Sequence, residues 1–125
     1  MDMAEEIKRP LVIVGSTDFF LSTNLGRIIT AAGLRCVRTN QMERIELELK
    51  KPGRVFVGDL KWEELQERGV LKKLVNVGAI CGNKVFAICP NDDEELKVLA
   101  KKSRVKETFI RYDIENRFKV YMELL

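Results

Sequence analysis

The chain has 125 residues, with 22 Lys or Arg and 19 Asp or Glu, so its formal net charge is +3. This length suits one domain, and 46% hydrophobic with 33% charged residues indicates a folded core and excludes a disordered, collagenous or coiled-coil chain. The absence of histidine excludes Ser-His-Asp and Cys-His catalysis, a zincin site and a phosphohistidine relay within the chain.

The first residues are polar and lack the apolar stretch of a signal peptide. We therefore expect a disordered leader over residues 1–9 and a single domain over residues 10–125. The apolar runs, such as residues 11–14, are far shorter than a membrane span, so no membrane association is expected.

Short apolar runs rich in β-branched residues alternate with segments that have helical spacing of apolar residues. Runs of the first kind are typical of strands that are buried on both faces of a parallel sheet. Gly33 ends the first helical segment, and Gly69 weakens the middle of the third. The predicted strands cover residues 11–14, 34–39, 54–59, 84–90 and 108–111, and the predicted helices cover residues 21–32, 42–49, 65–75, 92–102 and 114–125.

Five strand–helix units in succession predict an α/β fold with helices on both faces of a parallel sheet. The natural arrangement is a flavodoxin-like (βα)5 three-layer sandwich with strand order 2-1-3-4-5. Functional groups are then expected at the carboxyl ends of the strands.

Three cysteines, Cys36, Cys81 and Cys89, are an odd number and occur in no C-x-x-C pair. This pattern argues against a disulfide framework and against a zinc site, so a reducing cytoplasm is the expected location.

Polar or reactive side chains stand at three predicted strand ends: Asp59 after the third, Cys89 after the fourth and Arg111 after the fifth. The intervals between them are 30 and 22 residues. With this spacing the chain resembles the receiver domains of bacterial response regulators, the CheY-like family, over residues 11–125. The resemblance implies a phosphoacceptor at Asp59, a hydroxyl residue at the position of Cys89 and a lysine at that of Arg111.

The sequence departs from the family pattern around this site. Gly15-Ser16 replaces the pair of acids that helps to hold a divalent cation, and Asp18 lies further along, where a helix N-cap is expected. The Cys89 thiol is a weaker hydrogen-bond donor than a hydroxyl, and Arg111 carries a planar guanidinium instead of the ammonium group of a lysine. Thr108 stands where the switch aromatic of the family is usual. These departures predict a degenerate receiver that binds no cofactor and for which Mg²⁺ binding is doubtful.

Alternatives remain at several residues. Asp59 is expected to pair with Arg111, and phosphorylation of Asp59 is the competing interpretation. An arginine nearby would lower the pKa of the Cys89 thiol and make it a redox sensor, whereas burial would make it a small apolar side chain. The Gly15–Asp18 turn is either a turn with an N-cap or a phosphate cradle for a small ligand or nucleotide.

Two surface features suggest partners. A basic stretch, residues 97–106, lacks the interleaved aromatic residues that stack on bases, which argues against nucleic acid. Trp62 is expected to be partly exposed near the crevice. By resemblance to receivers, the face around the fifth strand is a candidate partner-binding face, with contacts from Thr108, Tyr112, Arg117 and Tyr121.

The sequence therefore predicts a non-enzymatic, receiver-like signalling domain in two-component signal transduction, a phosphorelay system. It would act through protein–protein contacts without the usual metal-dependent aspartyl phosphorylation. A histidine kinase or an effector is the implied kind of partner, and homodimerisation stays open. The alternatives are a genuine phosphoacceptor at Asp59 and a small-ligand or nucleotide-binding domain.

Overall fold

A computed structural model describes residues 9–125, so residues 1–8 of the predicted leader lie outside the described part of the chain. Arg9, which the sequence placed in that leader, contacts the domain: its guanidinium donates to the carbonyl oxygens of Ala32, at 2.7 Å, and of Leu125, at 3.2 Å. Arg9 is thus held against the domain.

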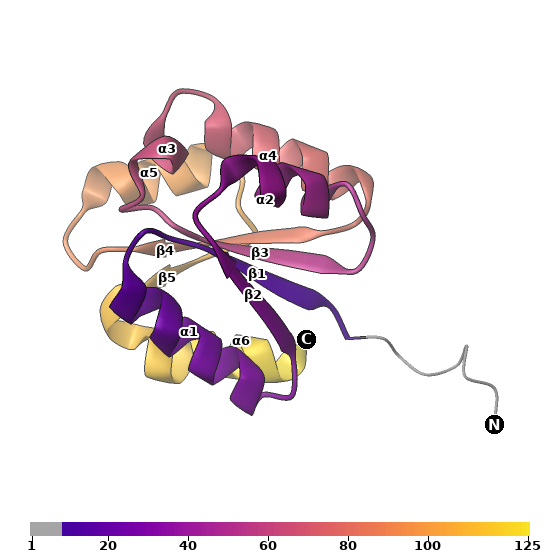
Figure 1. Cartoon of the computed structure of the whole chain (residues 1–125). Helices are drawn as coiled ribbons and strands as arrows, with labels where there is room; N and C mark the ends of the chain where they lie inside the picture. Colours follow the sequence, from indigo (N-terminus) through magenta and orange to yellow (C-terminus); the bar gives the residue numbers. More distant parts are fainter. Residues whose placement is uncertain (1–8) are drawn as a thin grey trace.

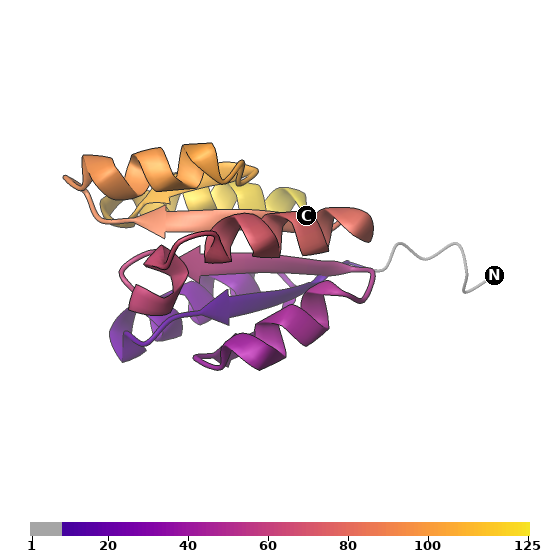
Figure 2. The same ribbon diagram turned by 90° about the horizontal axis from the view of Figure 1, so that it is seen from above.

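Five parallel strands form one sheet in the order β2-β1-β3-β4-β5, which confirms the predicted topology (Figures 1 and 2). The strands are β1 (Leu11–Gly15), β2 (Arg35–Thr39), β3 (Arg54–Asp59), β4 (Lys84–Cys89) and β5 (Glu107–Ile110). The helices are α1 (Phe19–Ala31), α2 (Met42–Leu49), α3 (Glu63–Gln66), α4 (Val70–Ile80), α5 (Glu94–Lys102) and α6 (Lys119–Leu124). A 3-10 turn, η2 (Arg111–Asp113), and a π turn, η3 (Ile114–Phe118), precede α6.

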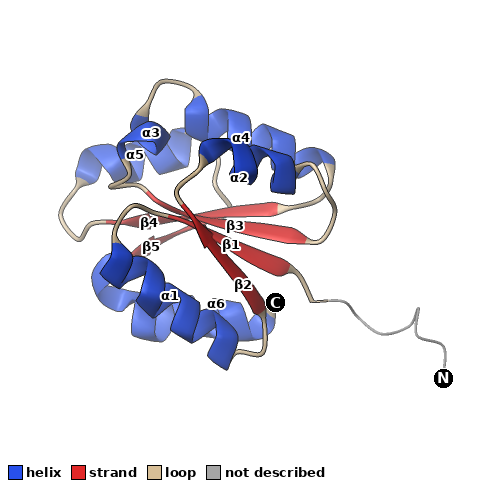
Figure 3. Ribbon diagram, in the orientation of Figure 1, coloured by secondary structure: helices blue, strands red, loops and turns tan. Residues whose placement is uncertain are grey.

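Helices cover both faces of the sheet: α1 and α6 lie on one face, and α2, α3, α4 and α5 lie on the other (Figure 3). Alternate residues of a strand point to opposite faces, so β1 contributes Val12 and Val14 to one apolar cluster and Ile13 to the other. All three side chains are fully buried. Their burial explains why the first strand is an unbroken apolar run.

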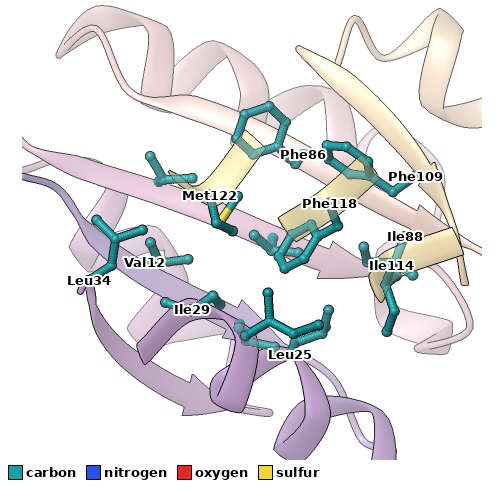
Figure 4. Packing of buried hydrophobic residues seen from close by; sticks show 14 of the residues in the cluster. Val12, Leu25, Ile29, Leu34, Phe86, Ile88, Phe109, Ile114, Phe118 and Met122 are labelled. Carbon is teal, nitrogen blue, oxygen red and sulfur yellow. The ribbon is translucent and has the colours of Figure 1, made fainter. Parts of the chain in front are cut away.

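Aromatic rings fill the cluster between the sheet and α6 (Figure 4). The ring centroid of Phe109 lies 5.7 Å from that of Phe86 and 5.3 Å from that of Phe118. Edge-on contacts at these distances are favourable beyond the area that they bury. They fix the last part of the chain against β4 and β5.

Three predicted elements differ clearly from the structure: the third helix, the fifth strand and the last helix. The predicted helix 65–75 is divided into α3 and α4, because Gly69 takes a φ of 79° between them. The fifth strand ends at Ile110, and Arg111 begins the 3-10 turn. Residues 114–118 continue as a π turn, so the regular part of the last helix starts later than predicted. Within residues 9–125 no helix is long and apolar enough to cross a membrane.

Candidate functional site

The carboxyl end of β3 places Asp59 at the centre of the sheet edge, next to β1 on one side and β4 on the other. Asp59 is only 2% exposed. A buried carboxylate is unfavourable unless hydrogen bonds replace the lost water. The neighbouring loops supply these bonds.

Each carboxylate oxygen of Asp59 accepts one hydrogen bond. The Ser16 hydroxyl donates to Oδ2 at 2.7 Å, and the Lys61 amide donates to Oδ1 at 3.0 Å. The Trp62 amide donates to the main-chain oxygen of Asp59 at 3.0 Å. These contacts hold the β3–α3 turn in place around the acid.

Ser16 also organises the β1–α1 turn. Its hydroxyl oxygen accepts a hydrogen bond from the Asp18 amide at 2.9 Å while it donates to Asp59. Asp18 is the N-cap of α1, as predicted, and its carboxylate accepts from the Leu21 amide at 3.0 Å. One hydroxyl thus couples the buried acid of β3 to the start of α1.

Arg111 pairs with Asp18, not with Asp59, which corrects the predicted ion pair. Its Nη2 lies 2.7 Å from Asp18 Oδ2, and both side chains are partly exposed. The hydrogen bond from the Leu21 amide, followed by that from Arg111, lowers the pKa of Asp18, although desolvation opposes them. The strand β5 ends at Ile110, one residue earlier than predicted. Arg111 therefore lies in η2, and from there its side chain reaches the N-cap of α1.

Cys89 is fully buried among apolar side chains that include Leu60 and Leu65. Desolvation raises the pKa of its thiol to about 11, and the charge of Asp93 adds to this effect. The prediction that a nearby arginine would lower this pKa is wrong. At neutral pH the group is a thiol and not the nucleophilic thiolate, which fits the interpretation as a small apolar side chain.

The donor set does not suit the divalent cation that the family resemblance implies. A Cβ atom added at Gly15 would lie 2.7 Å from the ring of Phe56, so an acid at this position has no room. Ser16 carries no charge, and Asp18 is already occupied by Leu21 and Arg111. Over residues 9–125 no group of three or more His, Cys, Asp or Glu side chains could hold a metal ion.

The predicted partner-binding residues lie along β5, in the turns after it and in α6. Arg117 donates to the Thr108 carbonyl at 3.1 Å and pairs with Glu107 at 3.0 Å. The Tyr121 hydroxyl donates to the same carboxylate at 2.7 Å. Tyr112 is 82% exposed, as expected, and it does not contribute to this network of side chains.

Trp62 is 4% exposed, which corrects the prediction that it is partly exposed. It packs in the cluster between the sheet and helices α2–α5, three residues after Asp59 in the chain. Sequence reasoning also missed Phe56, Lys61 and Glu107. No local signal marks Phe56, since its role depends on the register that pairs it with Ile13 and on the reach of its ring to Gly15. Lys61 acts through its main-chain amide, which every residue except proline carries.

A shallow hollow of about 540 Å³ lies beside the Gly15–Asp18 turn, at the ends of β1 and β2, with Thr17, Phe19 and Arg38 among its lining residues. The Asp18 carboxylate caps the amino end of α1. A phosphate at this helix end would meet that negative charge, so the turn is poorly suited to cradle one.

Neither a family model nor a curated protein sequence matches the chain. Similarity to solved structures is extensive but is confined to the fold. FixJ-N aligns with a TM-score of 0.73 at 14% identity, covering 94% of each chain. A putative response regulator from Chloroflexus aurantiacus J-10-fl aligns at 0.72 and 11% identity, covering 92% of this chain and 98% of that one. The CheY-like protein TadZ from Pseudomonas aeruginosa PAO1 aligns at 0.69 and 14% identity, covering 93% and 94%.

Proposed function

We propose that the chain is a receiver-like signalling domain that works through contacts with partner proteins and without Mg²⁺-dependent phosphorylation of Asp59. The structural similarity to receiver domains supports the receiver part of this proposal. The remainder rests on one observation: each oxygen of the buried carboxylate already accepts a hydrogen bond from the chain itself.

Phosphoryl transfer to an aspartate brings a crowded negative charge to the carboxylate, and a bound dication normally offsets it. Here the Ser16 hydroxyl donates a hydrogen bond to one carboxylate oxygen of Asp59, and the Lys61 amide donates to the other. Phe56 fills the space where a further acid would begin. The cationic Arg111 is committed to Asp18 and does not reach Asp59 as a substitute for the metal.

The single tryptophan offers a direct test for metal binding. Trp62 is buried, and its main-chain amide donates a hydrogen bond to the Asp59 carbonyl. A cation bound at Asp59 would therefore alter the fluorescence emission of Trp62. We expect no change in emission on titration with millimolar Mg²⁺. The variant Ser16→Asp adds a carboxylate where the hydroxyl meets Asp59 and is the positive control, since it should respond to Mg²⁺.

Phosphorylation is tested by intact-protein mass after incubation with Mg²⁺ and a small phosphodonor. We expect no added phosphoryl group. A mass gain in the wild type that disappears in Asp59→Asn would refute the proposal and establish the chain as a phosphoacceptor receiver.

The contacts themselves are proposed to involve the face formed by α5, β5 and η3. Its side chains are held in place by the network of Glu107, Arg117 and Tyr121, so the surface is preorganised for binding. A signalling protein such as a kinase or an effector is the proposed class of partner, and a second copy of the chain is the alternative.

A further inference from the structure

A groove of about 450 Å³ runs between the carboxyl-terminal half of α5, the strand β5 and Arg117. Lys97, Lys101, Lys106 and Arg117 contribute cationic side chains to it, and partly buried Val105 and Ile110 contribute apolar surface. The groove follows β5, which is the last strand of the sheet and has a neighbour on one side only. It therefore combines positive charge and an apolar surface along the last strand of the sheet.

The positive charge of the groove is only partly neutralised within the described chain. Glu107 is the acid that lines it, and its carboxylate already accepts from Tyr121 and pairs with Arg117. Lys97 contacts Glu94 at 3.5 Å. Over residues 9–125, Lys101 and Lys106 form no ion pair, and both are exposed.

We propose that this groove binds an acidic, extended segment of a partner protein, an inference that rests on the proposed action through protein contacts. Carboxylates of the segment would meet Lys101 and Lys106, and an apolar side chain would contact Val105 and Ile110. Complementary charge gives such a contact its specificity and speeds the encounter. The groove runs along β5, so an extended segment can follow it through side-chain contacts, because the Thr108 carbonyl at this edge already accepts from Arg117.

Nucleic acid fits the groove less well than an acidic peptide. Binding of single strands uses aromatic rings with a free face for stacking. The ring of Tyr121 instead packs against Phe109, with centroids 5.1 Å apart, and against Phe86 at 6.0 Å. Its hydroxyl is held by Glu107.

Within the described residues, the acidic cluster at the start of α5 is poorly placed to occupy the groove of a second copy. Asp92, Asp93, Glu94 and Glu95 lie at the start of α5. The Asp93 side chain accepts from the Leu96 amide, and Glu94 and Glu95 already belong to the helix. They do not form an extended strand.

The test uses the full chain and a fluorescein-labelled peptide of alternating Glu and Leu, with binding followed by fluorescence anisotropy. The double variant Lys101→Glu/Lys106→Glu should weaken binding about tenfold or more, because two attractions become repulsions. The control Arg44→Glu/Lys72→Glu changes the net charge equally on the exposed surfaces of α2 and α4 and should alter binding less than about twofold. A peptide of alternating Lys and Leu should not bind.

Three results would overturn the proposal. One is an equal loss in the two double variants, and another is equal competition by a single-stranded oligonucleotide of the same charge. The third is self-association that the groove variant abolishes, since this would assign the groove to a second copy. The assay contains neither Mg²⁺ nor a phosphodonor, so its failure leaves the conclusion on Asp59 intact. Phosphorylation of Asp59 would conversely refute the proposed function and leave the peptide result in place.

Discussion

Replacing Ser16 by alanine removes two buried hydrogen bonds at once. The hydroxyl donates to Asp59 Oδ2 at 2.7 Å and accepts from the Asp18 amide at 2.9 Å. A hydrogen bond to a charged group contributes about 1.5–3 kcal/mol, and one between neutral groups about 0.5–1.5 kcal/mol. Ser16 is 8% exposed, so a water molecule can recover part of this loss. We expect Ser16→Ala to lower the free energy of unfolding by about 2–3 kcal/mol.

Urea denaturation measures this loss. With a slope of about 2 kcal/mol per molar urea, the midpoint should fall by about 1–1.5 M. Ser22→Ala is the matched control, because Ser22 is equally buried but its hydroxyl donates only to the Phe19 carbonyl, at 3.2 Å within the same helix. Its cost should be about 0.5 kcal/mol.

A double-mutant cycle with Asp59→Ala assigns the loss to the contact between the two side chains. In the Asp59→Ala background the cost of Ser16→Ala should shrink by about 1 kcal/mol or more. An unchanged cost, or a cost no larger than that of Ser22→Ala, would refute the assignment of Ser16 as the partner of the buried carboxylate.

Four further predictions concern the surrounding residues. Arg111→Ala should cost about 1 kcal/mol or less, because the pair with Asp18 is partly exposed. Since the folded-state pKa of Asp18 lies below its ordinary value of 3.8, the stabilisation by this carboxylate is present above pH 3.8 and is lost as the pH falls through the folded pKa. Acid titrations of the unfolding free energy should show a smaller loss in Asp18→Asn, and an equal loss would contradict this. The Cys89 thiol should react with a disulfide reagent at pH 8 only after unfolding, in contrast to an accessible thiolate, which would react at once. Gly15→Ala should cost about 1–3 kcal/mol by overpacking against Phe56, and Gly15→Ala/Phe56→Val should recover part of it in the same urea assay; no recovery would show that the ring is not the obstacle.

The topology could be predicted from the sequence because it depends on pattern alone. Buried runs such as Val12, Ile13 and Val14 alternate with helical segments, and this order leaves few arrangements of a parallel sheet. Asp59 follows a buried run, so its place at the carboxyl edge of the sheet required no knowledge of side-chain geometry. The boundary at Gly69 was less certain, since a glycine inside a helical pattern is tolerated in some helices and ends others.

The partners of the charged groups could not be predicted in the same way. The sequence pattern pairs Arg111 with Asp59, whereas its partner in the structure, Asp18, depends on the path of the chain after β5. A 3-10 turn begins at Arg111, and from there the guanidinium meets the N-cap of α1. The exposure of Trp62 likewise depends on how the short helix α3 folds back over the sheet, which no periodicity in the sequence encodes.

The contact between Gly15 and Phe56 has a consequence for how this sequence could change. An acid at position 15 meets the ring, and a smaller residue at position 56 leaves a cavity while glycine is still present. Each substitution alone is therefore destabilising, whereas a smaller residue at position 56 relieves part of the clash that an acid at position 15 makes. To gain a metal-binding acid at position 15, the sequence must change at positions 15 and 56, and whichever change comes first gives a less stable protein. Selection that acts on one substitution at a time therefore tends to keep the site as it is.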